Sequence, residues 1–309
     1  MIRDDSWRFP SQVHRLDRIS LESGLTLPCY SNFSLSSGGA VRRAVVVVHG
    51  INRNAQDYFE SIDRAAADIG VAEDTIIVAP CFQIEKDERE DHDAFWTDSG
   101  RTSWKDGGGA VAPARFSSFT VMDVVLTALA DKDRFPQLTW ITLVGHSAGG
   151  QFTQRYAAGG RAPDTLRDVT IGYVTANPSS YLYLNSYRPI GENLLELCPG
   201  YNDYKYGLER RNEYCSVLNG EQIRQQYISR RVTYLLGSAD IDQDDDFETD
   251  CAANAQGGSR FERGRFYYSA MRMFFPSAQH DLIIVPEVGH EYDAIFNSAQ
   301  GKAAIFRNW

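Results

Sequence analysis

No apolar run in this sequence is long enough to span a bilayer. The longest blocks, AVVVV at 44–48 and LIIV at 282–285, have the length of strands, whereas a membrane-spanning helix needs about 18 apolar residues or more. Basic side chains are also in the minority, with 31 Lys and Arg against 41 Asp and Glu and a formal net charge of −10. Such a surface repels nucleic acid and anionic membranes, so we expect neither as a partner.

Cysteine is scarce, and none of the five cysteines stands in a C-x-x-C pair, which argues against a zinc site. Cys198, Cys215 and Cys251 lie in polar, loop-like sequence where a disulfide is feasible, and the odd total leaves at least one thiol free. The glycine-rich stretch GHSAGG at 145–150 has neither of the two glycine patterns that bind nucleotides. We therefore expect no metal and no cofactor.

The opening residues, MIRDDSWRFP, lack the apolar segment of a signal peptide. A leader removed before this point would leave no mark, so the compartment stays open, either the cytoplasm or the exterior of the cell. The hydrophobic fraction of 43% and the charged fraction of 23% are ordinary for a soluble globular protein. We expect residues 1–309 to form a single domain.

What the chain does contain is short apolar runs that alternate with helical patterns. Such β-branched runs suit strands buried on both faces. The alternation predicts an α/β protein with a mostly parallel central sheet flanked by helices. Strands are predicted twice within 12–34 and then at 44–48, 75–80, 139–144, 168–181, 231–237 and 281–287, with helices at 55–69, 119–131 and 149–158.

Two segments interrupt this alternation. Residues 181–230 are polar and rich in tyrosine, and residues 241–280 begin with an acidic loop and end in a helix-like stretch. We interpret both as insertions over the carboxyl ends of the strands, where open α/β sheets bind their ligands. The first insertion would form a small cap.

The sequence GHSAG at 145–149 matches the pattern G-x-S-x-G, and it follows a predicted strand and opens a predicted helix. Glycines two residues to either side of Ser147 leave room for the strand and the helix to approach each other. The free N–H groups at the start of the helix would then point to where an oxyanion forms. Ser147 is therefore the candidate nucleophile rather than part of an ordinary glycine turn.

A serine hydroxyl is a poor nucleophile unless a base is positioned beside it. His290 is the candidate base, because it follows the last predicted strand directly after Gly289. His280 is its competitor, but it precedes the same strand and so is expected at the wrong edge of the sheet.

The imidazole in turn needs a carboxylate that fixes its tautomer. Asp240 comes just after the strand predicted at 231–237, and Asp242 is a near alternative. The chain order Ser147, Asp240, His290 is the one expected on this architecture.

The acidic segment DIDQDDDFETD at 240–250 also raises the question of calcium. Counted from Asp240, position 6 of an EF-hand loop would be Asp245 rather than glycine, and position 12 would be Cys251 rather than glutamate. A solvated acidic loop is the preferred interpretation, with an irregular calcium site left open as the minor one.

Backbone N–H groups are the candidate oxyanion donors. Ile51 follows His49-Gly50 at the end of a strand, and Ala148 follows the nucleophile. Other side chains predicted to line the same mouth are equally explained as capping, surface or packing residues. This candidate substrate-binding set is Asn52, Arg53, His146, Trp96 and Trp104.

The motifs AVVVVHGI, GHSAGG, LLGSAD and PEVGH, in this order, resemble the α/β-hydrolase superfamily over roughly residues 40–160 and 231–309. The segments NPSSYLYL, LCPGYNDYKYGLE and CAANAQGGSRFERGRFYY resemble uncharacterised microbial members. The resemblance implies a serine hydrolase in which Ser147 attacks a carbonyl carbon with His290 as the base. One departure is the long interval from Asp240 to His290, which accommodates the extra segment at 241–280.

The predicted function is hydrolysis of a small-molecule carboxylic ester through an acyl-enzyme, as in a carboxylesterase. An amidase or peptidase with the same three residues stays open as an alternative. A binding protein that reuses the fold without turnover is the third. The natural substrate, the acyl-chain length and the oligomeric state are not set by the sequence.

Overall fold

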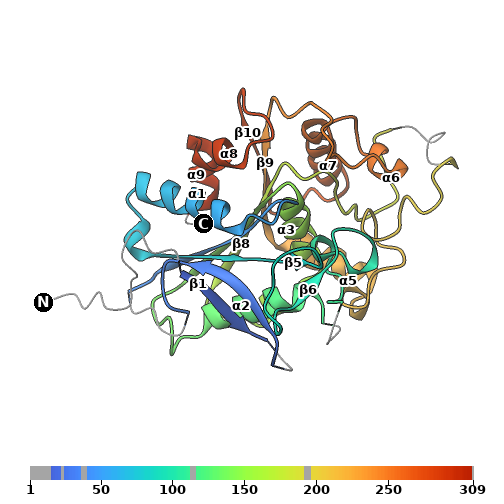
Figure 1. The fold of residues 1–309 in the computed structure, drawn as a ribbon. Coiled ribbons are helices and arrows are strands. Elements are labelled where there is room, and N and C mark those ends of the chain that lie inside the picture. The colour runs from blue at the N-terminus through green and yellow to red at the C-terminus, as the bar shows by residue number, and fades with distance from the viewer. Residues whose placement is uncertain (1–14, 22–23, 36–39, 112–115, 191–195, 308–309) are drawn as a thin grey trace, which may run out of the picture.

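The computed structural model describes residues 15–21, 24–35, 40–111, 116–190 and 196–307 (Figure 1). The strands of its main sheet are β1 (Arg15–Ser20), β2 (Thr26–Ser31), β3 (Arg43–Val48), β4 (Thr75–Pro80), β7 (Trp140–His146), β8 (Thr170–Ala176), β9 (Arg231–Gly237) and β10 (His280–Val285). A separate short pair is formed by β5 (Gln83–Ile84) and β6 (Phe95–Trp96). The helices are α1 (Ala55–Asp68), α2 (Ser118–Ala130), α3 (Ala148–Gly159), α5 (Gly220–Ser229), α6 (Cys251–Asn254), α7 (Arg260–Phe274), α8 (Tyr292–Asn297) and α9 (Ala299–Ile305).

The main sheet has eight strands in the order β1-β2-β4-β3-β7-β8-β9-β10. From β4 to β10 all neighbouring strands pair in parallel, and β1 and β2 add an antiparallel edge. Parallel neighbours need crossover connections, which the intervening helices supply. The predicted α/β class with a mostly parallel, helix-flanked sheet is confirmed.

Helices cover both faces of the sheet because its central strands are apolar on both sides (Figure 1). In β3, Ala44, Val46 and Val48 contact a core that also includes side chains of α2, α3, α5 and α7. Val45 and Val47 belong to the opposite core, which α1, α8 and α9 share. Successive side chains of a strand point to opposite faces, so a strand covered twice is apolar throughout.

Two strands end earlier than the sequence predicts, for local reasons. The strand expected at 168–181 ends at Ala176, because Asn177 has a φ of 41° and turns the chain out of the sheet. The strand expected at 281–287 runs from His280 to Val285, and the next residue, Pro286, has no N–H to donate to a ladder.

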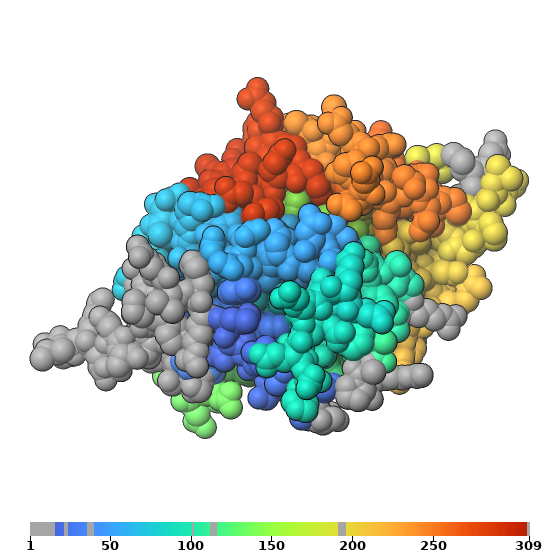
Figure 2. All heavy atoms as spheres, viewed as in Figure 1, coloured from blue at the N-terminus to red at the C-terminus, as the bar shows by residue number. Residues whose placement is uncertain are grey.

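The two predicted insertions are joined by a disulfide between Cys198 and Cys251, which leaves Cys215 as a buried free thiol. The first insertion ends in α5, which packs beside α3 as a crossover helix, and the second contains α6 and α7. Figure 2 shows the second segment and the C-terminal helices along the same edge of the molecule. That residues 181–230 act as a cap stays a prediction.

Among the helices within the described ranges, none combines the length and the apolar character that crossing a membrane requires.

Candidate active site

Ser147 occupies a strained turn between β7 and α3. Its φ of 57° and ψ of −120° lie in a region that non-glycine residues rarely adopt. Such strain costs on the order of 1–3 kcal/mol and persists only where the surrounding structure enforces it. The residue is buried, with 7% of its surface exposed.

The two glycines that flank Ser147 are required by close backbone contacts. A Cβ atom on Gly145 would lie 2.1 Å from the carbonyl oxygen of Gly149, and one on Gly149 would lie 2.1 Å from that of Val48. Neither contact is with a flexible side chain, so a methyl group would force the backbone apart. The pattern G-x-S-x-G therefore has a steric cause here.

Three of the predicted residues come together at the carboxyl ends of the strands. The Nε2 atom of His290 lies 3.0 Å from Oγ of Ser147, and its Nδ1 atom lies 2.7 Å from Oδ2 of Asp240. With the ring proton on Nδ1 donated to the carboxylate, Nε2 is free to accept the serine proton. Asp240 is 2% exposed, which shields this carboxylate from water.

The competing residues lie elsewhere. His280 begins β10 at the amino ends of the strands, where its Nδ1 lies 2.9 Å from the hydroxyl of Tyr234 and its Nε2 lies 3.0 Å from the carbonyl oxygen of Tyr227. Burial lowers the pKa of His280 to about 4, so the ring is neutral. Asp242 is exposed on the loop after β9.

The predicted oxyanion donors, Ile51 and Ala148, lie on two sides of Ser147. A Cβ built on Gly50 would lie 3.8 Å from Cβ of Ser147, so the turn that leads into Ile51 is adjacent to the serine. Ala148 is the first residue of α3, where backbone N–H groups have no partner within the helix. The positive end of the helix therefore faces the place where negative charge would develop.

His49 holds the turn after β3 in shape. Its Nε2 accepts a hydrogen bond of 2.9 Å from the N–H of Phe82, and its Nδ1 donates to the carbonyl of Gly50 at 2.8 Å. Burial lowers the pKa of His49 to about 4, so this bridging ring is neutral. His49 therefore has a structural task at the edge of the site.

His146 packs against the candidate base. The ring centroids of His146 and His290 are 4.5 Å apart, and Nδ1 of His146 lies 3.2 Å from the hydroxyl of Tyr58. Burial, followed by the proximity of His290, lowers the pKa of His146 well below its usual value. The ring thus supports His290 without adding a charge beside it.

The other predicted substrate residues differ in accessibility. Asn52 is exposed, whereas Arg53 donates from Nε to Asp87 at 2.7 Å and from Nη1 to the carbonyl of Ile51. Trp96 and Trp104 are fully buried. Their rings pack in an aromatic cluster with His49, Phe82 and Phe152. Substrate contact by these residues stays a prediction.

Asn177, which the sequence analysis did not predict as part of the site, links the two loops that carry Asp240 and His290. Its Oδ1 accepts from the N–H of Gly237 at 2.9 Å, and its Nδ2 donates to the carbonyl of Gly289 at 3.1 Å. This one buried side chain therefore ties the loop of the candidate acid to the loop of the candidate base. The available signal was the pair Asn-Pro after an apolar strand, which favours a turn.

Two carboxylates of the acidic loop bind other groups of the protein. Asp244 binds Arg260 at 2.6 Å, and Asp250 accepts from the hydroxyl of Tyr206 at 2.8 Å. Across the described ranges, no three His, Cys, Asp or Glu side chains gather closely enough to hold a metal ion.

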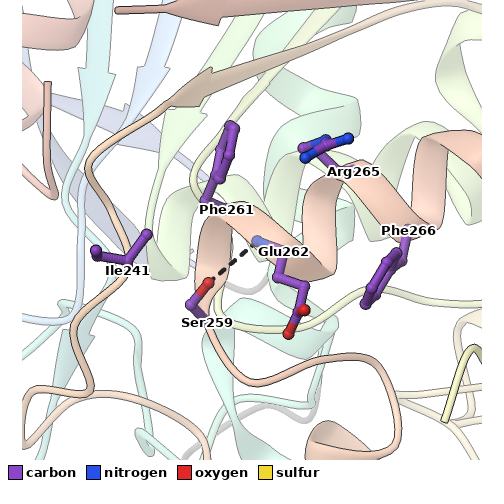
Figure 3. Close-up of a pocket in the computed structure, with 6 residues that line it drawn as sticks. All are labelled: Ile241, Ser259, Phe261, Glu262, Arg265 and Phe266. Atoms are coloured by element: carbon purple, nitrogen blue, oxygen red, sulfur yellow. Dashed lines mark hydrogen bonds between the residues drawn. The ribbon is translucent and has the colours of Figure 1, made fainter. Parts of the chain in front are cut away.

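A pocket of about 310 Å³ adjoins this loop (Figure 3). Ile241 approaches it from the loop, and Phe261 and Phe266 project from α7. Polar groups of α7, including Arg265, complete its lining. The pocket thus lies against the loop of the candidate acid, with Asp240 directly preceding Ile241 in the chain.

Solved structures with the same architecture have low sequence identity to this chain. The poly(3-hydroxybutyrate) depolymerase LpqC of Bordetella parapertussis is similar with a TM-score of 0.65 and 21% identity, covering 91% of this chain and 86% of its own. Poly(aspartic acid) hydrolase-1 of Sphingomonas sp. KT-1 has a TM-score of 0.67 and 18% identity, covering 95% and 98%. The S-formylglutathione hydrolase FrmB of Staphylococcus aureus has a TM-score of 0.51 and 9% identity, covering 95% and 98%.

No protein-family model and no curated protein sequence matches the chain. The structural likenesses nonetheless extend over most of the length of both partners. The chain has the α/β-hydrolase fold.

Proposed function

We propose that this chain is a serine hydrolase that cleaves small carboxylic esters through an acyl-enzyme on Ser147. The observation that carries the proposal is the continuous hydrogen-bonded path from Ser147 through His290 to Asp240, with links of 3.0 and 2.7 Å. The names of the neighbours, a depolymerase and two hydrolases, agree with hydrolysis as the type of reaction.

In the first half of the reaction, Oγ of Ser147 attacks the ester carbonyl carbon as its proton moves to Nε2 of His290. Asp240 stabilises the imidazolium that forms. The N–H groups of Ala148 and Ile51 bind the oxyanion, and each such donor is worth about 3 kcal/mol in the transition state. The imidazolium then returns its proton to the alcohol oxygen, the carbon–oxygen bond breaks, and the alcohol leaves.

In the second half, a water molecule takes the place of the alcohol. His290 removes a proton from the water as its oxygen attacks the acyl carbon, and the same oxyanion donors bind the second tetrahedral intermediate. Collapse of this intermediate breaks the bond to Oγ of Ser147, which recovers its proton from His290. The products are a carboxylic acid, an alcohol and the free enzyme.

The test is a panel of nitrophenyl esters of increasing acyl length, with Ser147→Ala as the matched control. We expect ester turnover by the wild type and none above background for the variant, with unchanged circular dichroism. Equal turnover by both proteins would remove Ser147 from the mechanism.

Amide hydrolysis by the same three residues is distinguished in the same experiment. Aminoacyl anilides present a poorer leaving group that must be protonated as it departs, so the same panel is run with anilides of matched acyl groups. We expect hydrolysis of the esters to be much faster. A preference for the anilides would assign the protein to the amidases instead.

A further inference from the structure

A buried arginine approaches the candidate acid from the side opposite His290. Arg260 is the first residue of α7, and its side chain has no exposed surface. Its Nη1 atom lies 3.7 Å from Oδ1 of Asp240, and its Nε donates to Oγ of Ser179 at 3.1 Å. The two oxygens of Asp240 are thus divided, Oδ2 facing the imidazole and Oδ1 facing a guanidinium.

A second carboxylate shares this guanidinium. Asp244 accepts from Nη1 of Arg260 at 2.9 Å and from Nη2 at 2.6 Å, while its own side chain is 45% exposed. The Asp240 contact is an ion pair beyond hydrogen-bond distance. A buried cation needs such partners to offset its desolvation, so Asp244 is the counter-ion that keeps Arg260 beside the triad acid.

The charge arrangement bears directly on the base. The carboxylate of Asp240 favours the protonated form of His290, which appears when the serine proton is transferred. The positive charge of Arg260 beside Oδ1 of Asp240 disfavours the protonated form of His290. The negative charge of Asp244 partly cancels that positive charge. The balance between Arg260 and Asp244 therefore sets how readily His290 accepts a proton.

Other titratable groups nearby leave this balance intact. Burial lowers the pKa of His146 well below its usual value and raises that of Tyr181 well above its own, so both are neutral. Arg263 lies one turn along α7 and donates to the carbonyls of Gly257 and Ser179. Burial lowers its pKa to about 10, so it stays charged in wild type and variants alike. Glu291 is exposed beside His290.

We propose that Arg260 is a positioning residue of the active site, which holds the carboxylate of Asp240 and, together with Asp244, sets the basicity of His290. This inference rests on the proposed function, and it gives the segment 241–280 a task. That segment delivers a cation to the acid from a helix whose outer side lines the pocket of Figure 3.

The experiment measures the rate at which a fluorophosphonate probe modifies Ser147 as a function of pH. Modification needs neutral His290, so the acid limb of the profile reports its protonation. Arg260→Gln should move the acid limb to higher pH by about half a unit or more, and Asp244→Asn should move it to lower pH by a similar amount. Arg260→Lys should restore most of the wild-type position, because the charge is kept.

A matched control separates this role from a general change of surface charge. Asp245→Asn removes the same charge from an exposed neighbour of Asp244, and we expect it to leave the acid limb in place. A purely structural role for Arg260 would slow labelling without opposite shifts. If Arg260→Gln fails to fold, the proposal is tested by comparing the acid limbs of Asp244→Asn and Asp245→Asn. Both substitutions are at exposed side chains, so we expect both variants to fold.

The inference is overturned if Asp244→Asn and Asp245→Asn have the same acid limb, or if the Arg260 and Asp244 variants shift it in the same direction. Ester turnover is followed in parallel. Normal labelling without turnover would contradict the proposed function and leave the Arg260 result standing. A wild type that the probe does not label would contradict both.

Discussion

The two halves of the candidate site are held in different ways. Ser147 is fixed by backbone contacts, because Gly145 and Gly149 pack against carbonyl groups at distances that admit no Cβ atom. Asp240 and His290 lie on loops that are joined by hydrogen bonds, both of the backbone and of the side chain of Asn177. The position of Ser147 thus depends on the absence of Cβ atoms at two glycines. The positions of Asp240 and His290 depend on hydrogen bonds between segments that are distant in the sequence.

This difference has a physical consequence. Steric exclusion between backbones tolerates no substitution, since there is no flexible end that could move aside. By contrast, a single substitution between the two loops removes only one or two hydrogen bonds, and each contributes about 1 kcal/mol net to stability. Substitutions of Gly145 or Gly149 should therefore disrupt the fold and the activity together, whereas loss of single hydrogen bonds between the loops of Asp240 and His290 should lower activity and stability in smaller steps.

The largest loss of activity should come from the candidate acid itself. Asp240→Asn keeps the shape of the side chain but removes the charge that stabilises the imidazolium, so we expect a loss of about 10⁴-fold in kcat. Esterase assays with folding checked by circular dichroism measure this. Asp242→Asn, a substitution at an exposed side chain nearby, should leave kcat unchanged. If Asp242→Asn loses activity and Asp240→Asn does not, Asp242 is the acid.

On the nucleophile side, Gly149→Ala should cost about 3 kcal/mol or more in the free energy of unfolding. The added methyl group would lie 2.1 Å from the carbonyl oxygen of Val48. Gly109→Ala is the matched control, because a Cβ there meets nothing within 4 Å. Denaturant unfolding should show a large loss for the first and little change for the second; equal midpoints would refute the steric account.

In the acidic loop that follows Asp240, Glu248 forms ion pairs with Lys205 and Lys105. Burial alone would raise the pKa of Glu248, but Lys205, Lys105 and Arg155 lower it from about 4.5 to about 2. A carboxylate with a depressed pKa contributes stability above its unfolded value, and this is lost as the pH falls through the folded value. Glu248→Gln should therefore destabilise the protein by up to about 3 kcal/mol near neutral pH.

That destabilisation should shrink as the pH falls from about 4.5 to about 2, because the wild type then loses the same charge. Thermal unfolding of both proteins across this interval measures the difference. A gap between wild type and variant that stays constant with pH would show that the ion pairs of Glu248 add nothing.

The smallest effect should come from Asn177→Ala, which removes one of the links between the two loops and leaves the backbone hydrogen bond from Ala239 to Val288 in place. Two hydrogen bonds are lost, so we expect a destabilisation of about 2 kcal/mol and a fall in kcat of about tenfold, with KM little changed. Steady-state kinetics and denaturant unfolding measure the two quantities. Wild-type kcat in a folded variant would mean that the loops keep their positions without Asn177.

The sequence predicted the features of the fold and the site that depend on local residue patterns. Alternating apolar runs predicted the sheet, and a serine between two glycines after a strand predicted the turn that the structure contains. His290 and Asp240 were predicted from their places just after strands, because parallel strands bring their carboxyl ends to one edge.

The remaining features depend on contacts between distant segments. Arg260 meets Asp240 and Ser179 only after folding, and nothing in its local sequence distinguishes it from Arg263. The sequence left open whether Trp96 and Trp104 line the site or pack inside the protein; both are fully buried, and burial is a property of the packed molecule. Contacts between side chains of distant segments therefore cannot be predicted from sequence motifs alone.

The central claim is that Ser147 becomes acylated because His290 accepts its proton. It is tested most directly by mixing the wild type with a slowly deacylating nitrophenyl ester and quenching in acid. We predict a burst of about one nitrophenol per enzyme and an acyl group on the peptide that contains Ser147, neither of which appears in Ser147→Ala. A wild type without burst or acyl group, or an acyl group on another residue, would contradict the account.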